Sequence, residues 1–302
     1  MPASDATMWH RRLAHLHSAA LRILVNGIRV THDKGQCDVC VQAKHKQKFI
    51  RPMVKRVTKP FELVHSDICG PFPTPTKING YRYFILSIDD YTRWTEVYLL
   101  HDKKAESCTA AYQTFQKKTE ARGYSVKRFR CDNGRGEYDN KLFRLLLAGA
   151  GTTFEPCPPY AHHKNGVGER SIGVITEKAR SMMIDAQVPV EFWGEAIFTA
   201  VYLHRRSPNN GIIKRDDRDD RDGYKAPYNT PYEMLHAYGK PYHDSDGNEI
   251  SYKAPLHRLR RFGCHVSKLI PERQRKGKFG AKSKLGCMIV GYLHHSTTTW
   301  RV

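Results

Sequence analysis

Acidic residues at the ends of strand-like segments constrain this chain more than any other feature of its sequence. In residues 63–68, Val64, Ser66 and Ile68 alternate with Leu63, His65 and Asp67, which predicts a strand; a Gly-Pro turn stops it and leaves Asp67 near its end. A second predicted strand, residues 125–131, leads directly into Asp132. Glu169 then opens a helical pattern of apolar residues: Ile172, Ile175, Ala179, Met182, Met183 and Ala186.

The position of Glu169 predicts a metal site. Glu169 lies three residues before Ile172 on the same apolar stripe, so we expect its carboxylate at the edge of the protein interior. An uncompensated negative charge is costly there, and a metal ion is a common compensation. Three such carboxylates can bind two Mg²⁺ ions, which clamp the attacking and leaving oxygens of an in-line phosphoryl displacement. From spacing alone, turn or cap roles for these acids are the alternative.

The charge of the chain indicates a polyanionic partner. Lys and Arg outnumber Asp and Glu by 50 to 30, and the formal net charge is +20. A membrane surface is the alternative partner, but no apolar run approaches the roughly 18 residues of a spanning helix. The N-terminus also lacks a signal-peptide pattern, so nucleic acid is favoured. The scattered single cysteines are typical of a reduced, intracellular protein.

A second metal site is predicted near the N-terminus. Cys37 and Cys40 form a zinc-type knuckle, and His10 and His15 would complete a tetrahedral site. Residues at this spacing do not share a helical face, so we expect His10 just before a helix that carries His15. His17 is the alternative to His15. A redox pair is the alternative to zinc, but it would need a strand before the motif and a helix after it, whereas charged loop surrounds it.

Four motifs together resemble a known family. HSDICGP, SIDDYTRW, CDNGRGEY and PYAHHKNGVGER occur in this order, which is similar to the integrase core of copia-class long-terminal-repeat retrotransposons. The resemblance implies an RNase H-like α/β fold in which Asp67, Asp132 and Glu169 are the catalytic residues and bind Mg²⁺ or Mn²⁺. Residues 133–168 separate the last two acids, one residue more than is common in the family, because the turn after Asp132 has an extra glycine. A surface turn tolerates that insertion at small entropic cost.

The resemblance also implies a domain organisation. His10, His15, Cys37 and Cys40 match the zinc ligands of a His-His-Cys-Cys domain that precedes the core in this family. The β-rich segments near the C-terminus resemble a small SH3-like barrel. We therefore expect a small helical zinc-binding pre-integrase domain at residues 1–48, a basic linker at 49–59 that either lies along DNA or is a solvated connector, the RNase H-like core at 60–207, a charged, largely flexible insert and connector at 208–255, and a truncated SH3-like β segment at 256–302.

Other residues near the predicted active site have less specific signals. Asp89 ends a predicted strand at residues 83–89, and Asp90 begins the turn to a second predicted strand at residues 95–100, so we assign both acids to a turn rather than to the metal site. The loop at residues 158–168 leads into the Glu169 helix, where a substrate strand would pass. Candidates for contacts with DNA phosphates are Lys164, Asn165, Arg170 and Lys178, with ordinary surface exposure as the alternative.

The resemblance implies a polynucleotidyl transferase that joins 3′-hydroxyl ends of element cDNA to target DNA. Such an enzyme would act as a homo-multimer on DNA in the nucleus after synthesis in the cytoplasm as part of a polyprotein. It would need no membrane and no small-molecule cofactor. The alternatives are a truncated or decayed copy that only binds nucleic acid, and an RNase H-type nuclease that cleaves without joining.

Overall fold

The computed structural model describes most of the chain as two compact units. The described residues are 5–24, 37–44, 57–132, 137–157, 166–213, 220–221, 224–225, 228–241, 243, 245–246, 248, 250–292 and 300–302. One unit comprises Lys46–Thr176 and His204–Ala254, and is called the core unit below. The other comprises Met1–His45, Glu177–Leu203 and Pro255–Val302, and is called the terminal unit. No helix within these described ranges is long and apolar enough to cross a membrane.

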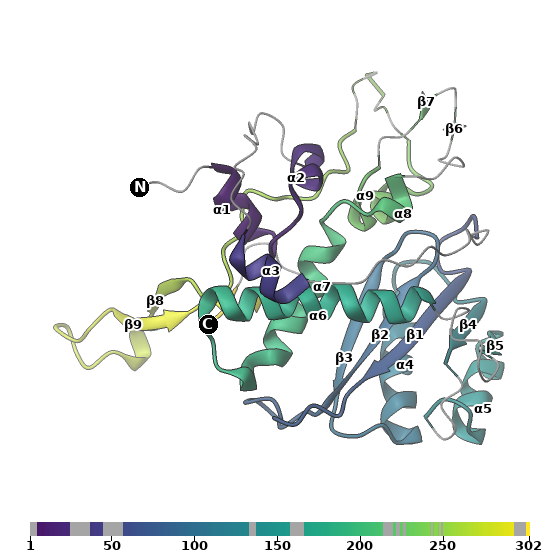
Figure 1. Ribbon diagram of the computed structural model, residues 1–302, viewed down its shortest axis with the longest axis horizontal. Coiled ribbons are helices and arrows are strands. Elements are labelled where there is room, and N and C mark those ends of the chain that lie inside the picture. Colours follow the sequence, from purple (N-terminus) through teal and green to yellow (C-terminus); the bar gives the residue numbers. More distant parts are fainter. Residues whose placement is uncertain are drawn as a thin grey trace. The chain divides into compact units, whose positions relative to one another are not determined.

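A five-stranded mixed sheet forms the centre of the core unit. Its strands lie in the order β3-β2-β1-β4-β5, as Figure 1 shows from one edge of the sheet to the other. β1 pairs antiparallel with β2, and β2 with β3, whereas β1 with β4 and β4 with β5 are parallel. The strands are β1 Leu63–Cys69, β2 Tyr83–Asp89, β3 Thr95–Leu100, β4 Arg128–Cys131 and β5 Thr153–Pro156. This mixed α/β architecture confirms the predicted fold class of the core.

Two helices pack against one face of this sheet. They are α4 Ala105–Glu120 and α5 Lys141–Gly149, and their buried side chains share one apolar cluster with the strands. Aromatic rings dominate the cluster: the Phe129 ring of β4 lies 4.8 Å from Tyr112 and 5.2 Å from Phe143, measured between centroids. Such tilted and edge-on contacts between rings are the favoured geometry. Asn140 begins α5, because its side chain accepts a hydrogen bond from the backbone N–H of Phe143.

Two longer helices, α6 and α7, come next in the chain. α6 spans Gly166–Ala186, and α7 spans Trp193–Arg205 after a single 3-10 turn, η2 Val190–Phe192. The apolar stripe of α6 is buried from Ile175 onwards, at Ile175, Ala179 and Met182. Helical periodicity therefore located α6 from the sequence.

Two short helices lie in the described part of residues 208–255. α8 Asn210–Ile213 is a short helix in which Ile212 is fully buried and clusters with Tyr91 and Met234. α9 Pro231–Ala237 begins with a capping box between Thr230 and Glu233. In the charged run, strand β6 Asp220–Arg221 pairs with strand β7 Tyr224–Lys225. Residues 214–219 and 222–223 of this run lie outside the described part. Ile212 of α8 and Met234 of α9 are buried in one cluster with Tyr91, whereas the largely flexible character of the remaining residues stays a prediction.

The terminal unit combines short helices and short strands. Its N-terminal helices are α1 Asp5–Arg12, α2 Ser18–Leu24 and α3 Asp38–Lys44. Towards the C-terminus, β8 His265–Leu269 pairs with β9 Ser283–Met288, with η3 Glu272–Gln274 between them, and β10 Gly291–Tyr292 pairs with β11 Trp300–Arg301. These are two separate two-stranded pairs, so an SH3-like barrel at residues 256–302 stays a prediction.

A buried cluster of charges stabilises one edge of the core sheet. The Glu96 carboxylate of β3 is 1% exposed, and its oxygens lie 2.8 Å from Arg205, 3.2 Å from Arg122 and 3.7 Å from Lys118. The Arg205 guanidinium is 4% exposed, and its centre lies 4.4 Å from the centroid of the Trp94 ring. Burial of charge at this depth is tolerated only when the charges are paired.

Candidate active site and metal centre

The first two predicted catalytic acids follow equivalent positions on neighbouring strands. β1 and β4 are parallel, and Ser66 pairs with Cys131. The residues that follow are Asp67 and Asp132, so the two acids lie side by side at one end of the sheet. Neighbouring strands are about 4.8 Å apart, so the two residues are neighbours across the sheet.

The environment of Asp67 is shaped by burial and by other acids. Burial is the largest cause of a raised pKa, which reaches about 7, although the backbone N–H of Ile68 donates a hydrogen bond of 2.9 Å to the carboxylate and lowers it. The negative charges of Asp132, Glu169 and Glu137 raise the pKa further. Mutual repulsion of this kind is relieved when a cation binds between carboxylates.

Glu169 lies in the first turn of α6 and is exposed. The expectation that it lies at the edge of the interior is therefore wrong: the first buried side chain of the apolar stripe is that of Ile175, although the backbone of Gly166 and Gly168 is buried in the first turn. Its charge still acts on Asp67. Within the described residues, the three acids are not drawn into one tight group of ligand atoms.

The segment after Asp132 is anchored beside the first acid. The buried hydroxyl of Tyr138 lies 2.7 Å from that of Ser66, the residue before Asp67. Ser66 donates its own proton to the Leu86 carbonyl oxygen at 3.0 Å, so Tyr138 donates to Ser66. This bond brings Glu137 to the same end of the sheet. The sequence reasoning missed both Glu137 and Tyr138, although both belong to the motif CDNGRGEY.

Asp89 and Asp90 have structural roles, as the turn assignment predicted. The Asp89 carboxylate is fully buried and accepts hydrogen bonds from the backbone N–H groups of Phe61 and Thr92, both at 2.8 Å, and from the Thr92 hydroxyl at 2.6 Å. The Asp90 carboxylate lies 3.2 Å from both His65 and Arg93. Asp89 therefore fixes the β2–β3 turn and also holds the chain that enters β1.

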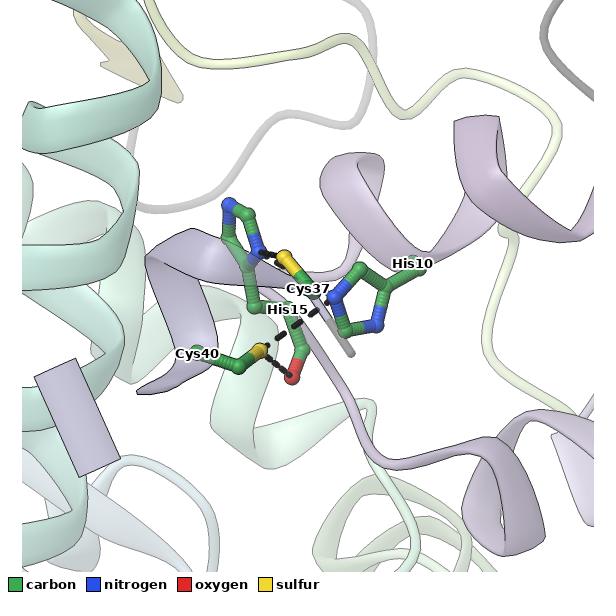
Figure 2. Close-up of side chains that lie close together, drawn as sticks. All are labelled: His10, His15, Cys37 and Cys40. Carbon is green, nitrogen blue, oxygen red and sulfur yellow. Dashed lines mark hydrogen bonds between the residues drawn. The ribbon is translucent and has the colours of Figure 1, made fainter. Parts of the chain in front are cut away.

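The four predicted zinc ligands converge in the terminal unit. One potential ligand atom from each of His10, His15, Cys37 and Cys40 lies within 4.8 Å of the others, and Figure 2 shows the side chains pointing toward one another. His10 Nε2 is 3.1 Å from His15 Nδ1 and 3.3 Å from Cys40 Sγ, and His15 Nδ1 is 3.5 Å from Cys37 Sγ. Neighbouring ligand atoms on a tetrahedral Zn²⁺ are about 3.3 to 3.8 Å apart. The donor set and its spacing therefore fit zinc.

A second contact orients the first histidine. His10 Nδ1 lies 2.8 Å from the carbonyl oxygen of Leu16, which can only accept, so Nδ1 carries the proton and Nε2 is left with a lone pair that faces the cysteines. Hydrogen bonding of the second ring nitrogen is the usual way in which a metal-ligating histidine is oriented.

The local structure around the histidines differs from the prediction. His10 lies inside α1, and His15 lies after the helix, whereas we expected the helix to carry His15. Positive φ angles at Ala14 and His15, 54° and 58°, turn the chain back so that the two rings meet. His17 is exposed, and its Nδ1 accepts the N–H of Ala19. The structure therefore gathers His15, not His17, with the cysteines.

Two family descriptions match the sequence. The Integrase core domain matches residues 57–162, and the GAG-pre-integrase domain matches residues 2–45. The Pol polyprotein of transposon TNT 1-94 from Nicotiana tabacum is 32% identical over 290 residues, which cover 94% of this chain. The chain corresponds to the integrase region of copia-type retrotransposon Pol polyproteins.

Other similarities agree with this assignment. The Pol polyprotein of transposon RE2 from Arabidopsis thaliana is 30% identical over 217 residues, 68% of this chain. The integrase chain spans 19% of the TNT 1-94 polyprotein and 14% of the RE2 polyprotein. A solved intasome of simian T-cell lymphotropic virus, in complex with PP2A regulatory subunit B56 gamma, has a TM-score of 0.48 at 14% identity and covers 68% of this chain and 65% of that chain. That similarity is too weak to add to the assignment.

The predicted DNA contacts of this integrase chain have mixed outcomes. Arg170 is exposed, next to Glu169 in α6, and its contact with phosphate stays a prediction. Lys178 is 7% exposed, so the structure does not present it to DNA and does not support a phosphate contact there. Periodicity did not reveal this, because a buried lysine and an exposed one have the same sequence signal. Lys164 and Asn165 lie outside the described residues.

Proposed function

We propose that the chain joins the 3′-hydroxyl ends of element cDNA to target DNA. The parallel pairing of β1 and β4 supports this proposal most strongly, because it sets Asp67 beside Asp132 in a chain that matches the integrase core. Glu169 is the third acid of the proposed site. Its negative charge raises the pKa of Asp67, and it lies in the first turn of α6. Bound cations would offset the repulsion between the three carboxylates and so let Glu169 approach the other two acids.

The residues have separate roles in the proposed reaction. Asp67 and Asp132 would hold two divalent ions, and Glu169 would hold one of them. Bound Mg²⁺ or Mn²⁺ would stabilise charge on the attacking and leaving oxygens. A new bond forms between the element 3′-oxygen and a target phosphorus, and the target bond from that phosphorus to its own 3′-oxygen breaks. The proton of the attacking hydroxyl passes to solvent and the leaving oxygen gains one, so no covalent protein intermediate is needed.

The histidine and cysteine cluster has a structural role in this proposal. Zn²⁺ bound by His10, His15, Cys37 and Cys40 would join α1 to α3, two short helices that are far apart in the sequence. Segments of this size rarely bury enough apolar surface to fold alone, and a structural zinc supplies the missing stabilisation.

DNA is the proposed partner, and the formal charge of +20 supports it. Two cDNA ends must be held together for concerted joining, so we place the chain in a homo-multimer on DNA. Its site of action is then the nucleus, after synthesis in the cytoplasm as part of a polyprotein. A fusion of the full chain to a fluorescent protein should accumulate in nuclei, and exclusion from nuclei would contradict this part of the proposal.

Strand transfer by the purified, zinc-loaded chain is the direct test. Labelled duplexes that end in the terminal repeats of the element are incubated with a supercoiled plasmid and Mg²⁺ or Mn²⁺, and joined products are separated on a gel. Joining by the wild type and its loss in Asp132→Asn support the proposal. Binding of the duplex without joining would instead assign the chain to a binding module, and cleavage without joining would assign it to an RNase H-type nuclease.

A further inference from the structure

Lys103, which lies next to the proposed active site, forms an ion pair with Glu137. The roles assigned so far do not explain this pair. Lys103 lies between β3 and α4, and its ammonium nitrogen is 2.5 Å from a carboxylate oxygen of Glu137. Exposed pairs of this kind typically contribute less than about 1 kcal/mol to stability. Stability alone is therefore a weak reason for the pair.

The backbone next to Glu137 is fixed relative to the catalytic acids. Tyr138 is buried and donates its hydroxyl proton to Ser66, which directly precedes Asp67. Two residues further on, Asn140 begins α5 through its bond to Phe143. Glu137 is thus held at the end of the sheet where Asp67 and Asp132 lie, and the effect of its charge on Asp67 agrees with that position.

The ammonium group of Lys103 is available to a ligand. The Lys103 side chain is 56% exposed, and that of Glu137 is 20% exposed. An ammonium has three donor hydrogens, and the Glu137 oxygen accepts one of them. The bond to Glu137 raises the pKa of Lys103, so the side chain is cationic at neutral pH. Glu137 is the acidic partner of Lys103 among the described residues, which leaves two donors for an anion.

The adjacent lysine has a different environment. Lys104 is 76% exposed, and its ammonium is 3.9 Å from Asp102. The Asp102 carboxylate accepts the backbone N–H of Lys104 at 3.1 Å and the hydroxyl of Ser107 at 2.7 Å. It therefore caps the first turn of α4, and the positive end of that helix is already compensated. Lys104 carries the same charge as Lys103, and its ion-pair partner is Asp102 rather than Glu137.

We propose that Lys103, held in place by Glu137, binds a phosphate of the DNA strand that enters the Asp67–Asp132 site. The proposal rests on the proposed function. A group of acids repels the DNA backbone, and a fixed cation beside it offsets that repulsion where the strand must approach. Lys103 is the substrate-contacting residue, and Glu137 is a positioning residue.

The test measures DNA binding and strand transfer separately. Affinity of the zinc-loaded full chain for a labelled terminal-repeat duplex is measured by fluorescence anisotropy over a series of salt concentrations. Loss of one phosphate contact should lower the slope of log K against log salt by about 0.9 in Lys103→Ala. Lys104→Ala should leave the slope unchanged, and Lys103→Arg should restore it. In strand transfer, Lys103→Ala should raise KM for DNA more than it lowers kcat.

The role of Glu137 needs a double-mutant cycle. If Glu137 positions the ammonium, Lys103→Ala should weaken binding less in the Glu137→Gln background than in the wild type. Additive effects would overturn the positioning role. Equal changes of slope in Lys103→Ala and Lys104→Ala would overturn the specific contact, because the total charge would then explain both. Wild-type binding without strand transfer would refute the proposed function, while the slopes would still decide the role of Lys103.

Discussion

Neutralisation of Glu96 should destabilise the core unit strongly without touching the proposed active site. In Glu96→Gln the side chain keeps its shape but loses the charge that compensates three cations. Arg205 is affected most, because its guanidinium is 4% exposed and lies against the Trp94 ring, where water cannot replace the carboxylate. A buried cation without a counter-charge is among the most costly defects that a single substitution creates.

Two routes give a similar magnitude for this loss. Removal of one partner from a buried ion pair typically costs about 3 to 5 kcal/mol. Burial alone would raise the pKa of Glu96, but Arg205, Lys118, Arg122 and the Trp94 N–H together lower it from 4.5 to about 2. A depression of this size corresponds to about 3 kcal/mol of net stabilisation of the charged form. We therefore expect Glu96→Gln to lower the free energy of unfolding by about 3 kcal/mol at pH 7.

The pH dependence gives the prediction a second readout. A carboxylate whose pKa is lowered by folding stabilises the folded state fully above its unfolded pKa and loses this effect as the pH falls towards its folded pKa. The difference between wild type and Glu96→Gln should therefore be largest above about pH 5 and shrink between pH 4.5 and 2. Urea unfolding, followed by tryptophan fluorescence at several pH values, measures this difference.

Glu62→Gln is the matched control. Glu62 pairs with Arg128 at 3.4 Å, but both side chains are about one-third exposed, at 35% and 33%. Such a pair should contribute less than about 1 kcal/mol. If Glu96→Gln cost no more than Glu62→Gln, or if its effect were the same at pH 3 and pH 7, the assignment of the buried cluster as a main source of stability would be refuted.

The remaining predictions concern metal, chemistry and DNA. Cys40→Ser should lose the single zinc measured by mass spectrometry of the native protein and part of the helical circular dichroism, whereas His17→Asn should keep both; zinc retained by Cys40→Ser would exclude the proposed ligand set. Asp132→Asn should fold and bind DNA but lose strand transfer by several orders of magnitude, because the metal site supplies most of the barrier reduction. Asp89→Asn should instead lower the free energy of unfolding by about 1 to 3 kcal/mol, since an amide cannot accept all the hydrogen bonds of this buried carboxylate. An unchanged free energy of unfolding in that variant would contradict the structural role. DNA affinity should fall steeply with salt, and a flat profile between low and physiological ionic strength would show that the basic excess is not the binding surface.

Periodicity predicted the regular parts of the core well. The strands at Tyr83–Asp89 and Thr95–Leu100 have the predicted bounds, because alternating apolar residues pack on one or both faces. β5 was missed: it has only four residues and ends in proline, so it is too short for alternation to show. Ile212 was missed for a related reason, since one buried residue in a charged run has no period.

For the candidate sites too, the sequence indicated some residues and missed others. Residue type and order indicated Asp67, Asp132 and the four potential zinc ligands, because each has chemistry that few other residues offer. The roles of Glu137, Tyr138 and Lys103 depend on contacts between segments that are far apart in the chain, such as the bond from Tyr138 to Ser66. The turn at Ala14 and His15 was also beyond sequence reasoning, because alanine does not favour a positive φ and histidine, although enriched there, adopts it too seldom to predict.

The parallel pairing of β1 with β4 makes the distance between Asp67 and Asp132 independent of the chain that connects them. That connection includes the turn around Ile78, a residue that is 56% exposed. Insertion of a peptide tag there, or a break of the chain, should leave the two strands in register, because their hydrogen bonds and the aromatic cluster behind them hold the pairing. The first two acids could then be supplied by separate fragments that recombine, which would allow the integration reaction to be switched on by mixing two inactive halves.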